Sequence, residues 1–579
     1  MSAAAVEITH AGITHTHIDG AKTGERSRYG SGQSVGRSFP LWPELVCSRV
    51  TRELWNGLRL FEPTLASTIC SRSGRLSLGL QSTTSNKAKQ PDSGAFDRRP
   101  IAACALARTT RAGFLRLLPN ITNQQSLPGS HMHLLNLLAV SMVLPLASCA
   151  IGPSSSSDTG FGASPYIPAP ESTLIPMVNI APVQERPAHF LPTAPPGFSV
   201  TEFASGLAHP RWLYTLPNGD VLVAESDAPK EHDEGSGIFG WIRRQVMKRA
   251  GAGVPSPDCI VLLRDANGSG VAQTQTVFLR GLHSPFGMAL IGNQLYVANT
   301  DALLRFDYVP DATSIASAGV KVADLPAGPI NHHWTKNILA DRAGKHLYIT
   351  VGSNSNAGEN GVDAEDGRAR ILEFEVESGR LRPYAIGLRN ANGLSWQPES
   401  GALWTAVNER DDLGNNLVPD YMTAVKDGGF YGFPYSYYGQ HIDTRVKPQR
   451  PDMVARAMEP DYALGNHTAS LGLVFYDRTQ FPAHYHGGAF VGQHGSWNRK
   501  PRSGYKVVFI PFKDGKPVGA PEDFLSGFLT ADGNAVGRPV GVALDLTGAL
   551  LVADDVGSAV WRVATRDSVK SAEVAPANK

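Results

Sequence analysis

The chain has 579 residues, and its 53 Lys and Arg nearly balance its 52 Asp and Glu, for a formal net charge of +1. Nucleic-acid-binding proteins usually carry a basic excess or stripe, so we expect no nucleic-acid partner. Gly (59 residues) and Pro (41 residues) are spread among many short apolar runs, which indicates turn-rich β structure rather than long helices. None of the 5 cysteines forms a close pair such as CxxC, so neither a zinc ribbon nor a dithiol motif is indicated.

Residues 1–131 show no sustained helical or strand period and are rich in scattered Ser, Thr, Arg, Gly and Ala. Two interpretations remain open. The segment is a disordered extension, or it is an artefact of start-site choice and translation begins later. The signal-like segment that follows favours the second interpretation, because a signal peptide normally begins a chain.

Met132 opens an apolar run, MHLLNLLAVSMVLPLASCA, which is too short to span a bilayer well and is typical of a signal-peptide core. The run ends in Leu146-Ala147-Ser148-Cys149, which resembles the bacterial lipobox, whose cysteine is lipidated. We therefore predict a lipoprotein-type signal peptide at 132–149, lipidation of Cys149, and a periplasmic protein held to a membrane by its lipid. The lack of Lys or Arg between Met132 and the apolar core departs from the pattern. A buried apolar helix with an incidental cysteine is the alternative.

Residues 150–196 are rich in Ser and Pro and are expected to form a flexible linker. With Cys149 lipidated, the mature chain would keep only Cys259, which excludes an internal disulfide. Further along, SGIFGWIRRQVMKRA (Ser236 to Ala250) has helical spacing of apolar residues. This predicted helix packs on its parent domain or lies on a membrane surface.

From Phe198 onward a phrase recurs in which a turn glycine precedes a short apolar strand. The six copies begin at Gly219, Gly292, Gly344, Gly401, Gly488 and Gly548. A repeat of this size built from short strands is typical of a β-propeller with about four strands per blade. We predict an all-β chain with a six-bladed propeller at 197–565 and a disordered tail at 566–579. An irregular pair of β-sandwiches is the alternative fold.

A polar cluster containing His or Arg stands before each repeat, in a chain with only 17 His. The clusters are His209-Pro210-Arg211, His283-Ser284-Pro285-Phe286, Asn331-His332-His333, Arg389-Asn390-Ala391-Asn392, Asn466-His467-Thr468 and Arg538-Pro539. Equivalent loops of a propeller meet at one end of its channel, so these side chains are expected to surround one small-molecule site. A cationic ring with His suits an anionic ligand and a general base that works near neutral pH. Taken singly, each of these side chains is more often a satisfied polar residue than a catalyst.

Another polar stretch follows the fourth repeat, at Asn408-Glu409-Arg410-Asp411-Asp412-Leu413-Gly414-Asn415-Asn416. Its carboxylates and amides are hard oxygen ligands of the kind that Ca²⁺ prefers. The stretch lacks the spacing of an EF-hand loop, and acidic loops are usually only solvated.

Several long motifs in the region from Pro196 to Val563 resemble the sorbosone dehydrogenase family, which is related to the soluble glucose and aldose dehydrogenases that depend on pyrroloquinoline quinone (PQQ). The motifs are NHHWTKNILADRAGKHLYITVGSNSN, GLRNANGLSW, VNERDDLGNNLVPD, DGGFYGFPYSYYG and QHGSWNRKPRSGYKVVFIPF. The resemblance implies a six-bladed propeller that holds PQQ and Ca²⁺ at one end of its channel.

The resemblance also implies roles for individual residues. His333 is the expected catalytic base, and Arg389 is expected to act in catalysis as well. Cofactor contacts are expected from Arg389, Asn390, Arg410, His467, Arg499 and Arg538, and metal contacts from Glu409 and Asp411. In the glucose dehydrogenase branch a second Arg follows the position of Arg538, where this chain has Val540. That branch also has a small hydroxyl residue in place of His467, so glucose is not implied as the substrate.

The function implied by the resemblance is PQQ- and calcium-dependent oxidation of a sugar or sugar aldehyde, of the sorbosone or aldose type. His333 would take a proton from the substrate while a hydride passes to the quinone. The electrons would then pass to a cytochrome or another quinone. Two other functions remain open, a metal-dependent sugar lactonase and a non-catalytic ligand-binding propeller.

Overall fold

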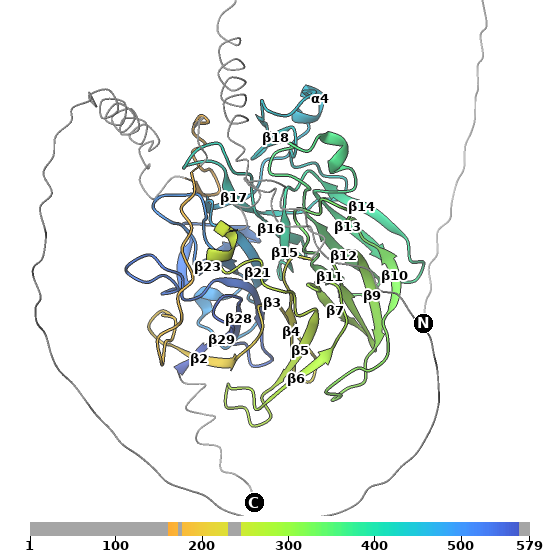
Figure 1. Ribbon diagram of the computed structural model, residues 1–579, viewed down its shortest axis with the longest axis vertical. Helices are drawn as coiled ribbons and strands as arrows, with labels where there is room; N and C mark the ends of the chain where they lie inside the picture. The colour runs from red at the N-terminus through yellow and green to blue at the C-terminus, as the bar shows by residue number, and fades with distance from the viewer. Residues whose placement is uncertain (1–159, 172–176, 230–244, 567–579) are drawn as a thin grey trace, which may run out of the picture. The chain divides into compact units, whose positions relative to one another are not determined.

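The computed structural model describes residues 160–171, 177–229 and 245–566 (Figure 1). The expected extension at 1–131, the signal peptide at 132–149 with Cys149, and residues 567–579 of the tail lie outside the described residues. Of the predicted insertion helix only residues 245–250 are described, and 245–249 are helical. Within the described ranges, no helix is long and apolar enough to cross a membrane.

Six antiparallel sheets confirm the predicted six-bladed propeller. Blade 1 contains β3 (Pro210–Thr215), β4 (Val221–Glu225), β5 (Cys259–Arg264) and β6 (Thr274–Leu279). Blade 2 contains β7 (Met288–Ile291), β8 (Gln294–Ala298), β9 (Ala302–Asp307) and β10 (Val320–Asp324). Blade 3 contains β11 (Ile338–Ala340), β12 (His346–Val351), β13 (Arg370–Glu375) and β14 (Leu381–Ile386).

The remaining blades have longer connections. Blade 4 contains β15 (Ala391–Trp396), β16 (Leu403–Val407), β17 (Pro419–Ala424) and β20 (Tyr462–Asn466), with β1 (Phe161–Gly162) added at its edge. Blade 5 contains β21 (Ser470–Phe475), β22 (Ala489–Gln493), β23 (Lys506–Ile510) and β26 (Glu522–Leu525). Blade 6 contains β27 (Pro539–Leu544), β28 (Leu550–Asp554), β29 (Ala559–Thr565) and β2 (Phe198–Ser205). Small elements in the connections are η2 (Val362–Glu365), β18 (Ser436–Tyr437), β19 (His441–Ile442), α4 (Pro451–Val454), η3 (Ala483–Tyr485), β24 (Phe512–Lys513) and β25 (Lys516–Pro517).

The propeller closes on itself because its first and last segments share a blade. β2 pairs with β29 along its full length, from Phe198 opposite Thr565 to Ser205 opposite Ala559. The innermost strands β3, β7, β11, β15, β21 and β27 each contact the next one around the ring. All six begin at the same end, which we call the site end. The second strand of each antiparallel blade finishes at that end.

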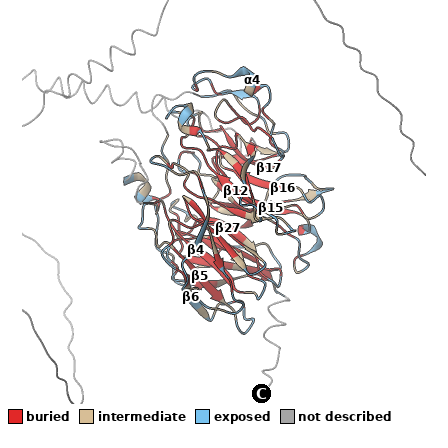
Figure 2. Cartoon of the chain, turned by 90° about the vertical axis from the view of Figure 1, so that its right-hand side faces the viewer, coloured by how far each residue is buried: buried red, intermediate tan, exposed pale blue. Residues whose placement is uncertain are grey.

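Most central strands are buried on both faces, because each blade is packed between two others (Figure 2). In β4, Val221 and Val223 pack toward blade 6 while Leu222 and Ala224 pack toward blade 2. This explains the continuous apolar runs of the repeats. The buried apolar residues form six clusters, one between each pair of neighbouring blades.

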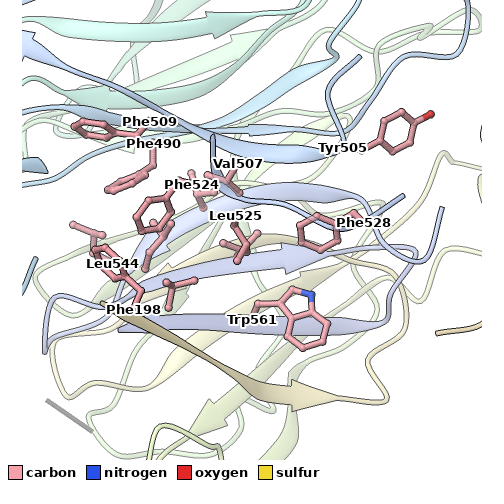
Figure 3. Packing of buried hydrophobic residues seen from close by; sticks show 14 of the residues in the cluster. Phe198, Phe490, Tyr505, Val507, Phe509, Phe524, Leu525, Phe528, Leu544 and Trp561 are labelled. Carbon is pink, nitrogen blue, oxygen red and sulfur yellow. The ribbon is translucent and has the colours of Figure 1, made fainter. Parts of the chain in front are cut away.

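The largest of these clusters lies between blades 5 and 6 and is rich in aromatic rings (Figure 3). Phe198 of β2 packs edge-to-face on Phe524 of β26, with ring centroids 5.1 Å apart. Trp561 of β29 is fully buried in the same cluster. The outermost strand of blade 6, β2, is thus fixed by packing on blade 5 as well as by its pairing with β29.

The described part of the stretch that we expected to be a flexible linker contributes to the folded domain. Phe161 of β1 pairs with Leu464 of β20, and isolated bridges join Val183 to Ala535 and Thr193 to Ser526. Ala181 is completely buried. These pairings extend the domain upstream of the first blade strand.

Candidate active site

The polar clusters identified in the sequence lie shortly before the innermost strands, at the site end. In four blades a residue of the cluster has a left-handed backbone. These residues are His209 (φ 58°), Ser284 (φ 43°), Asn331 (φ 39°) and His467 (φ 55°). The shared turn shows that these four clusters are structurally equivalent.

His333 lies in the loop before β11, and its imidazole is oriented by Ser353, which follows β12. Nδ1 lies 2.9 Å from the carbonyl oxygen of Ser353. A carbonyl only accepts hydrogen bonds, so Nδ1 carries the proton and Nε2 keeps its lone pair in the neutral ring. Burial lowers the pKa of His333 well below its ordinary value, and the charges of Arg389 and His332 lower it further. The partly exposed ring is therefore a neutral proton acceptor at neutral pH.

The His333 loop is held from behind by Arg368, a buried residue that sequence analysis did not identify. Its Nη2 donates to the carbonyl oxygen of His333 at 2.8 Å, and its Nη1 donates to Oδ1 of Asn331 at 3.0 Å. Burial lowers the pKa of the Arg368 guanidinium to about 10. Arg368 remains a cation at neutral pH and fixes the loop that carries His333.

Arg389 and Asn390 lie close to His333. An added Cβ on Gly352 would come within 2.5 Å of both Asn390 Oδ1 and His333 Cβ, so these two side chains flank the glycine closely. The guanidinium of Arg389 donates from Nε to the carbonyl of Asn356 and from Nη1 to the carbonyl of Glu409, both at 2.9 Å. Oδ1 of Asn390 is buried without a hydrogen-bond partner.

Glu409 and Asp411 do not form a ready metal site. Oδ1 of Asp411 accepts from Asn498 at 2.8 Å and lies 3.1 Å from Nδ1 of His467, while its carbonyl oxygen accepts from Arg410. The Glu409 side chain is buried away from water, which raises its pKa to about 7. Among the described residues, no group of three or more His, Cys, Asp or Glu is arranged to hold a metal ion.

His467 is fixed at both ring nitrogens. Nδ1 contacts the Asp411 carboxylate at 3.1 Å and Nε2 contacts the carbonyl oxygen of Gly414 at 3.0 Å. Both partners only accept hydrogen bonds, so both nitrogens carry protons and the ring is a buried imidazolium. Burial opposes this charge, but the Asp411 carboxylate outweighs it and raises the pKa of His467.

The guanidinium of Arg410 is buried and bonds with other groups of the protein. Its Nη1 pairs with the buried carboxylate of Asp443, and its Nε donates to the carbonyl of Asp411 at 2.9 Å. Asp443 lies in the long connection between β17 and β20, so Arg410 ties that connection to blade 4. Its contact with a cofactor stays a prediction, because Nε and both terminal nitrogens of the guanidinium already donate within the protein.

Arg499 and Arg538 are joined by residues 177–183, which we call the N-terminal strap. Asn179 Nδ2 donates to the carbonyl of Arg499 at 2.7 Å, and Arg538 Nη2 donates to the carbonyl of Ala181 at 3.1 Å. The Arg538 guanidinium lies 5.0 Å from the centre of the Tyr505 ring, and its buried Nε has no partner. The strap therefore orients two of the predicted cofactor residues.

A second group is centred on Asp555 and joins the predicted cluster residues His209 and Arg211 to two residues that the sequence did not indicate, His494 and Asp555 itself. The Asp555 carboxylate accepts from Nη1 of Arg211 at 2.5 Å and lies 2.9 Å from Nε2 of His494 and 3.8 Å from Nε2 of His209. Burial opposes ionisation, yet the nearby His494 and Arg211 hold the pKa of Asp555 far below its ordinary range. Arg211 belongs to β3 of blade 1, and its guanidinium also lies 6.0 Å from the centre of the Trp334 ring, in the loop before blade 3.

Apart from Arg368, the residues that we missed share a position in the repeat. His494 and Asp555 directly follow the second strand of blades 5 and 6, and Ser353 follows that of blade 3 after one glycine. In an antiparallel blade the end of the second strand lies beside the start of the first. The polar residues that end each repeated phrase could therefore have been identified together with those that precede it.

Comparisons with known proteins agree with this architecture. The sequence profile of the TrAA12-like family matches residues 258–427 and 439–566. An uncharacterised protein of Borreliella burgdorferi is 28% identical over 293 residues, which cover 49% of this chain and 76% of that protein. A pyrroloquinoline quinone-dependent pyranose dehydrogenase of Coprinopsis cinerea is 24% identical over 361 residues, covering 54% of this chain and 44% of that enzyme.

Among solved structures, a Trichoderma reesei protein of carbohydrate-active enzyme family AA12 matches with a TM-score of 0.52 and 17% identity. The match covers 65% of this chain and 97% of that one. This likeness supports the six-bladed fold. Because the family profile matches more than half of the residues, the chain belongs to the TrAA12-like family.

Proposed function

We propose that this protein is a PQQ-dependent oxidoreductase that oxidises a sugar or a sugar aldehyde. Membership of the TrAA12-like family and the similarity to a PQQ-dependent pyranose dehydrogenase support this proposal. The observation that carries it is the state of His333, a neutral imidazole whose Nδ1 is fixed by the Ser353 carbonyl and whose Nε2 is left to accept a proton.

The residues at the site end fit an anionic, planar cofactor. PQQ carries carboxylates and a quinone, and both need donors. Arg538 is 3% exposed and has an unpaired Nε, and Arg211 has a second unpaired buried Nε. Buried guanidinium donors without partners are costly unless a ligand satisfies them. Arg538 would therefore bind a carboxylate of the cofactor, with Arg211 near it.

When bound, PQQ would supply a two-electron oxidant that accepts a hydride from a substrate carbon. The chain would supply the proton acceptor, since Nε2 of His333 can take the proton of the substrate hydroxyl group or of a hydroxyl group of a hydrated aldehyde. Arg389 would keep a positive charge beside the reacting atoms, where its guanidinium is held by the carbonyls of Asn356 and Glu409.

The residues suggested as calcium ligands do not fit that ion in this arrangement. The Glu409 and Asp411 carbonyls accept from arginines, and the Asp411 carboxylate faces His467 and Asn498. A calcium requirement would show as a loss of activity after chelation that Ca²⁺ restores.

The location and the partners of the protein belong to the same proposal. A lipid at Cys149 would hold it on the periplasmic side of a membrane, where a cytochrome or a quinone would take the electrons. Metabolic labelling with a fatty-acid analogue tests this, because a Cys149→Ser variant should lose the label.

The function is tested with purified protein to which PQQ is added, with and without Ca²⁺. The absorbance of the bound quinone is followed during titration with sugars and sugar aldehydes, including sorbosone. Reduction by any of them supports the proposal and begins to identify the substrate. Failure to bind PQQ, together with lactone hydrolysis in its absence, would contradict the proposal and favour a lactonase.

A further inference from the structure

His494 and Asp555 form a dyad across two blades at the site end. His494 follows β22 of blade 5, and Asp555 follows β28 of blade 6. Nε2 of His494 lies 3.1 Å and 2.9 Å from the two carboxylate oxygens of Asp555. The carboxylate is almost fully buried, whereas 21% of the His494 side chain is exposed. The ring is thus held by a buried carboxylate while part of the side chain is exposed.

The contacts define which ring nitrogen carries the proton. An ionised carboxylate only accepts hydrogen bonds, so Nε2 of His494 donates to Asp555 and the neutral ring keeps its lone pair on Nδ1. Burial lowers the pKa of His494, and the charges of Arg538 and Arg211 oppose the effect of Asp555. His494 thus has the same protonation state as His333, but with the two nitrogens exchanged.

The charges around the dyad explain why Asp555 stays ionised while His494 stays neutral. The carboxylate pairs with the guanidinium of Arg211 at 2.5 Å and also accepts from the backbone N–H of Val556 at 2.7 Å. The other neighbouring ring, His209, donates from Nδ1 to the Ser226 carbonyl at 2.8 Å and so turns its Nε2 toward Asp555. The charge of Arg211 therefore balances that of Asp555 without a second cation. The hydrogen bond from Nε2 of the neutral His494 orients the imidazole ring.

We propose that His494, oriented by Asp555, accepts a hydrogen bond from a substrate hydroxyl group other than the one that loses its proton to His333. This inference rests on the proposed function and adds to it a residue that determines specificity. A substrate with several hydroxyl groups satisfies both histidines, whereas a simple alcohol or aldehyde satisfies only His333. The dyad thus favours polyhydroxylated substrates and provides a contact for one particular hydroxyl group.

The first test needs no activity. Protein labelled with ¹⁵N in its histidines is studied by NMR at neutral pH without cofactor, and the His494 signals are assigned from their loss in a His494→Phe variant. We expect a proton on Nε2 and none on Nδ1. A proton on Nδ1 would overturn the inference, because the ring would then donate rather than accept.

The second test compares the best substrate with its monodeoxy analogues, each with the PQQ-loaded protein. We expect wild type to prefer the parent sugar over one analogue by about tenfold in kcat/KM, the value of one hydrogen bond. This preference should fall to near one in His494→Phe. It should be partly kept in His494→Gln, whose amide can both donate to Asp555 and accept. His484→Phe is the control, since His484 pairs with the Glu522 carboxylate outside the site.

The outcomes separate the two proposals. A wild-type protein that binds PQQ but oxidises no substrate contradicts the proposed function. If the wild type is active but His494→Phe keeps the same preference for the parent sugar over every monodeoxy analogue, only the role of His494 is contradicted.

Discussion

Backbone carbonyls orient His333 of blade 3 and Arg389 of blade 4, whereas one carboxylate, Asp555 of blade 6, orients His494 of blade 5 and Arg211 of blade 1. In the first half, carbonyl groups of Ser353, Asn356 and Glu409 orient His333 and Arg389. In the second half, Asp555 binds both His494 and Arg211. We call these the carbonyl half and the carboxylate half of the site end.

The difference matters because a carbonyl has no charge to lose. The acceptors of the carbonyl half do not titrate, and burial and the charge of Arg389 lower the pKa of His333 without an opposing carboxylate. The carboxylate half depends on a buried ion pair, which is costly to break. We therefore expect mutations in the carbonyl half to affect catalysis and mutations in the carboxylate half to affect stability as well.

The largest expected effect is the loss of turnover in His333→Ala. Removal of a general base typically costs about 10²–10⁴-fold in rate. Affinity for PQQ, measured by absorbance titration, should change little, because His333 is expected to act on the substrate. His346→Ala is the matched control, since His346 lies at the opposite end of β12 and pairs with Asp341. Near-normal turnover in His333→Ala would refute the assignment of the base.

The next effect is the loss of stability in Asp555→Ala. The change leaves Arg211 buried without its carboxylate, and breaking a buried pair in this way costs about 3–5 kcal/mol of unfolding free energy. Denaturant unfolding measures it. The exposed pair of Lys321 and Asp324 provides the contrast, since Asp324→Ala should leave the midpoint unchanged. Equal effects of the two changes would remove the distinction between the halves.

The difference in unfolding free energy between wild type and Asp555→Ala should also depend on pH, which no bond of the carbonyl half predicts. The pKa of Asp555 is lowered in the folded protein, so its stabilising contribution is fully present above the ordinary aspartate pKa of about 4 and is lost as pH falls below it. The gap in unfolding free energy between wild type and Asp555→Ala should stay constant from neutral pH to about 5 and shrink below about 4. A constant gap down to pH 2 would contradict an ionised Asp555.

A smaller effect is expected in the pH profile of turnover. The proposed role of His333 requires a neutral ring, and its lowered pKa keeps the ring neutral above the ordinary value of 6.5 and for some distance below. Activity should therefore be flat from about pH 6.5 to 8 and fall only in more acidic solution. If activity already begins to fall above pH 7 as the solution is acidified, His333 titrates like an exposed histidine or another group limits the rate.

The smallest expected effect is that of Asn179→Ala in the N-terminal strap. The change removes one hydrogen bond to the carbonyl of Arg499 and should cost about 1 kcal/mol of unfolding free energy. It should also weaken PQQ binding measurably if the strap orients Arg499 and Arg538. Gln273→Ala is the control, because Gln273 bonds in an exposed turn of blade 1. Identical PQQ affinity in Asn179→Ala and wild type would limit the strap to a structural role.

The sequence by itself determined the fold and one half of the site. Turn glycines and short apolar strands are local signals, and six copies of one phrase specify six blades whatever lies far away in the chain. The clusters before the innermost strands, such as Asn331-His332-His333 and Arg389-Asn390, are local as well. Their meeting at one end follows from the symmetry of the repeat.

Only the tertiary structure decided which polar groups pair. Arg211 and Asp555 are 344 residues apart in the sequence and meet because β3 and β27 are neighbours in the closed ring. The sequence does not show that Arg410 pairs with Asp443, which lies in the long connection between β17 and β20. Residues 177–183 read as a linker because Pro-rich segments have no strand period, yet they bond with site loops of blades 5 and 6. Charge pairing depends on distances between segments, which a linear pattern does not contain.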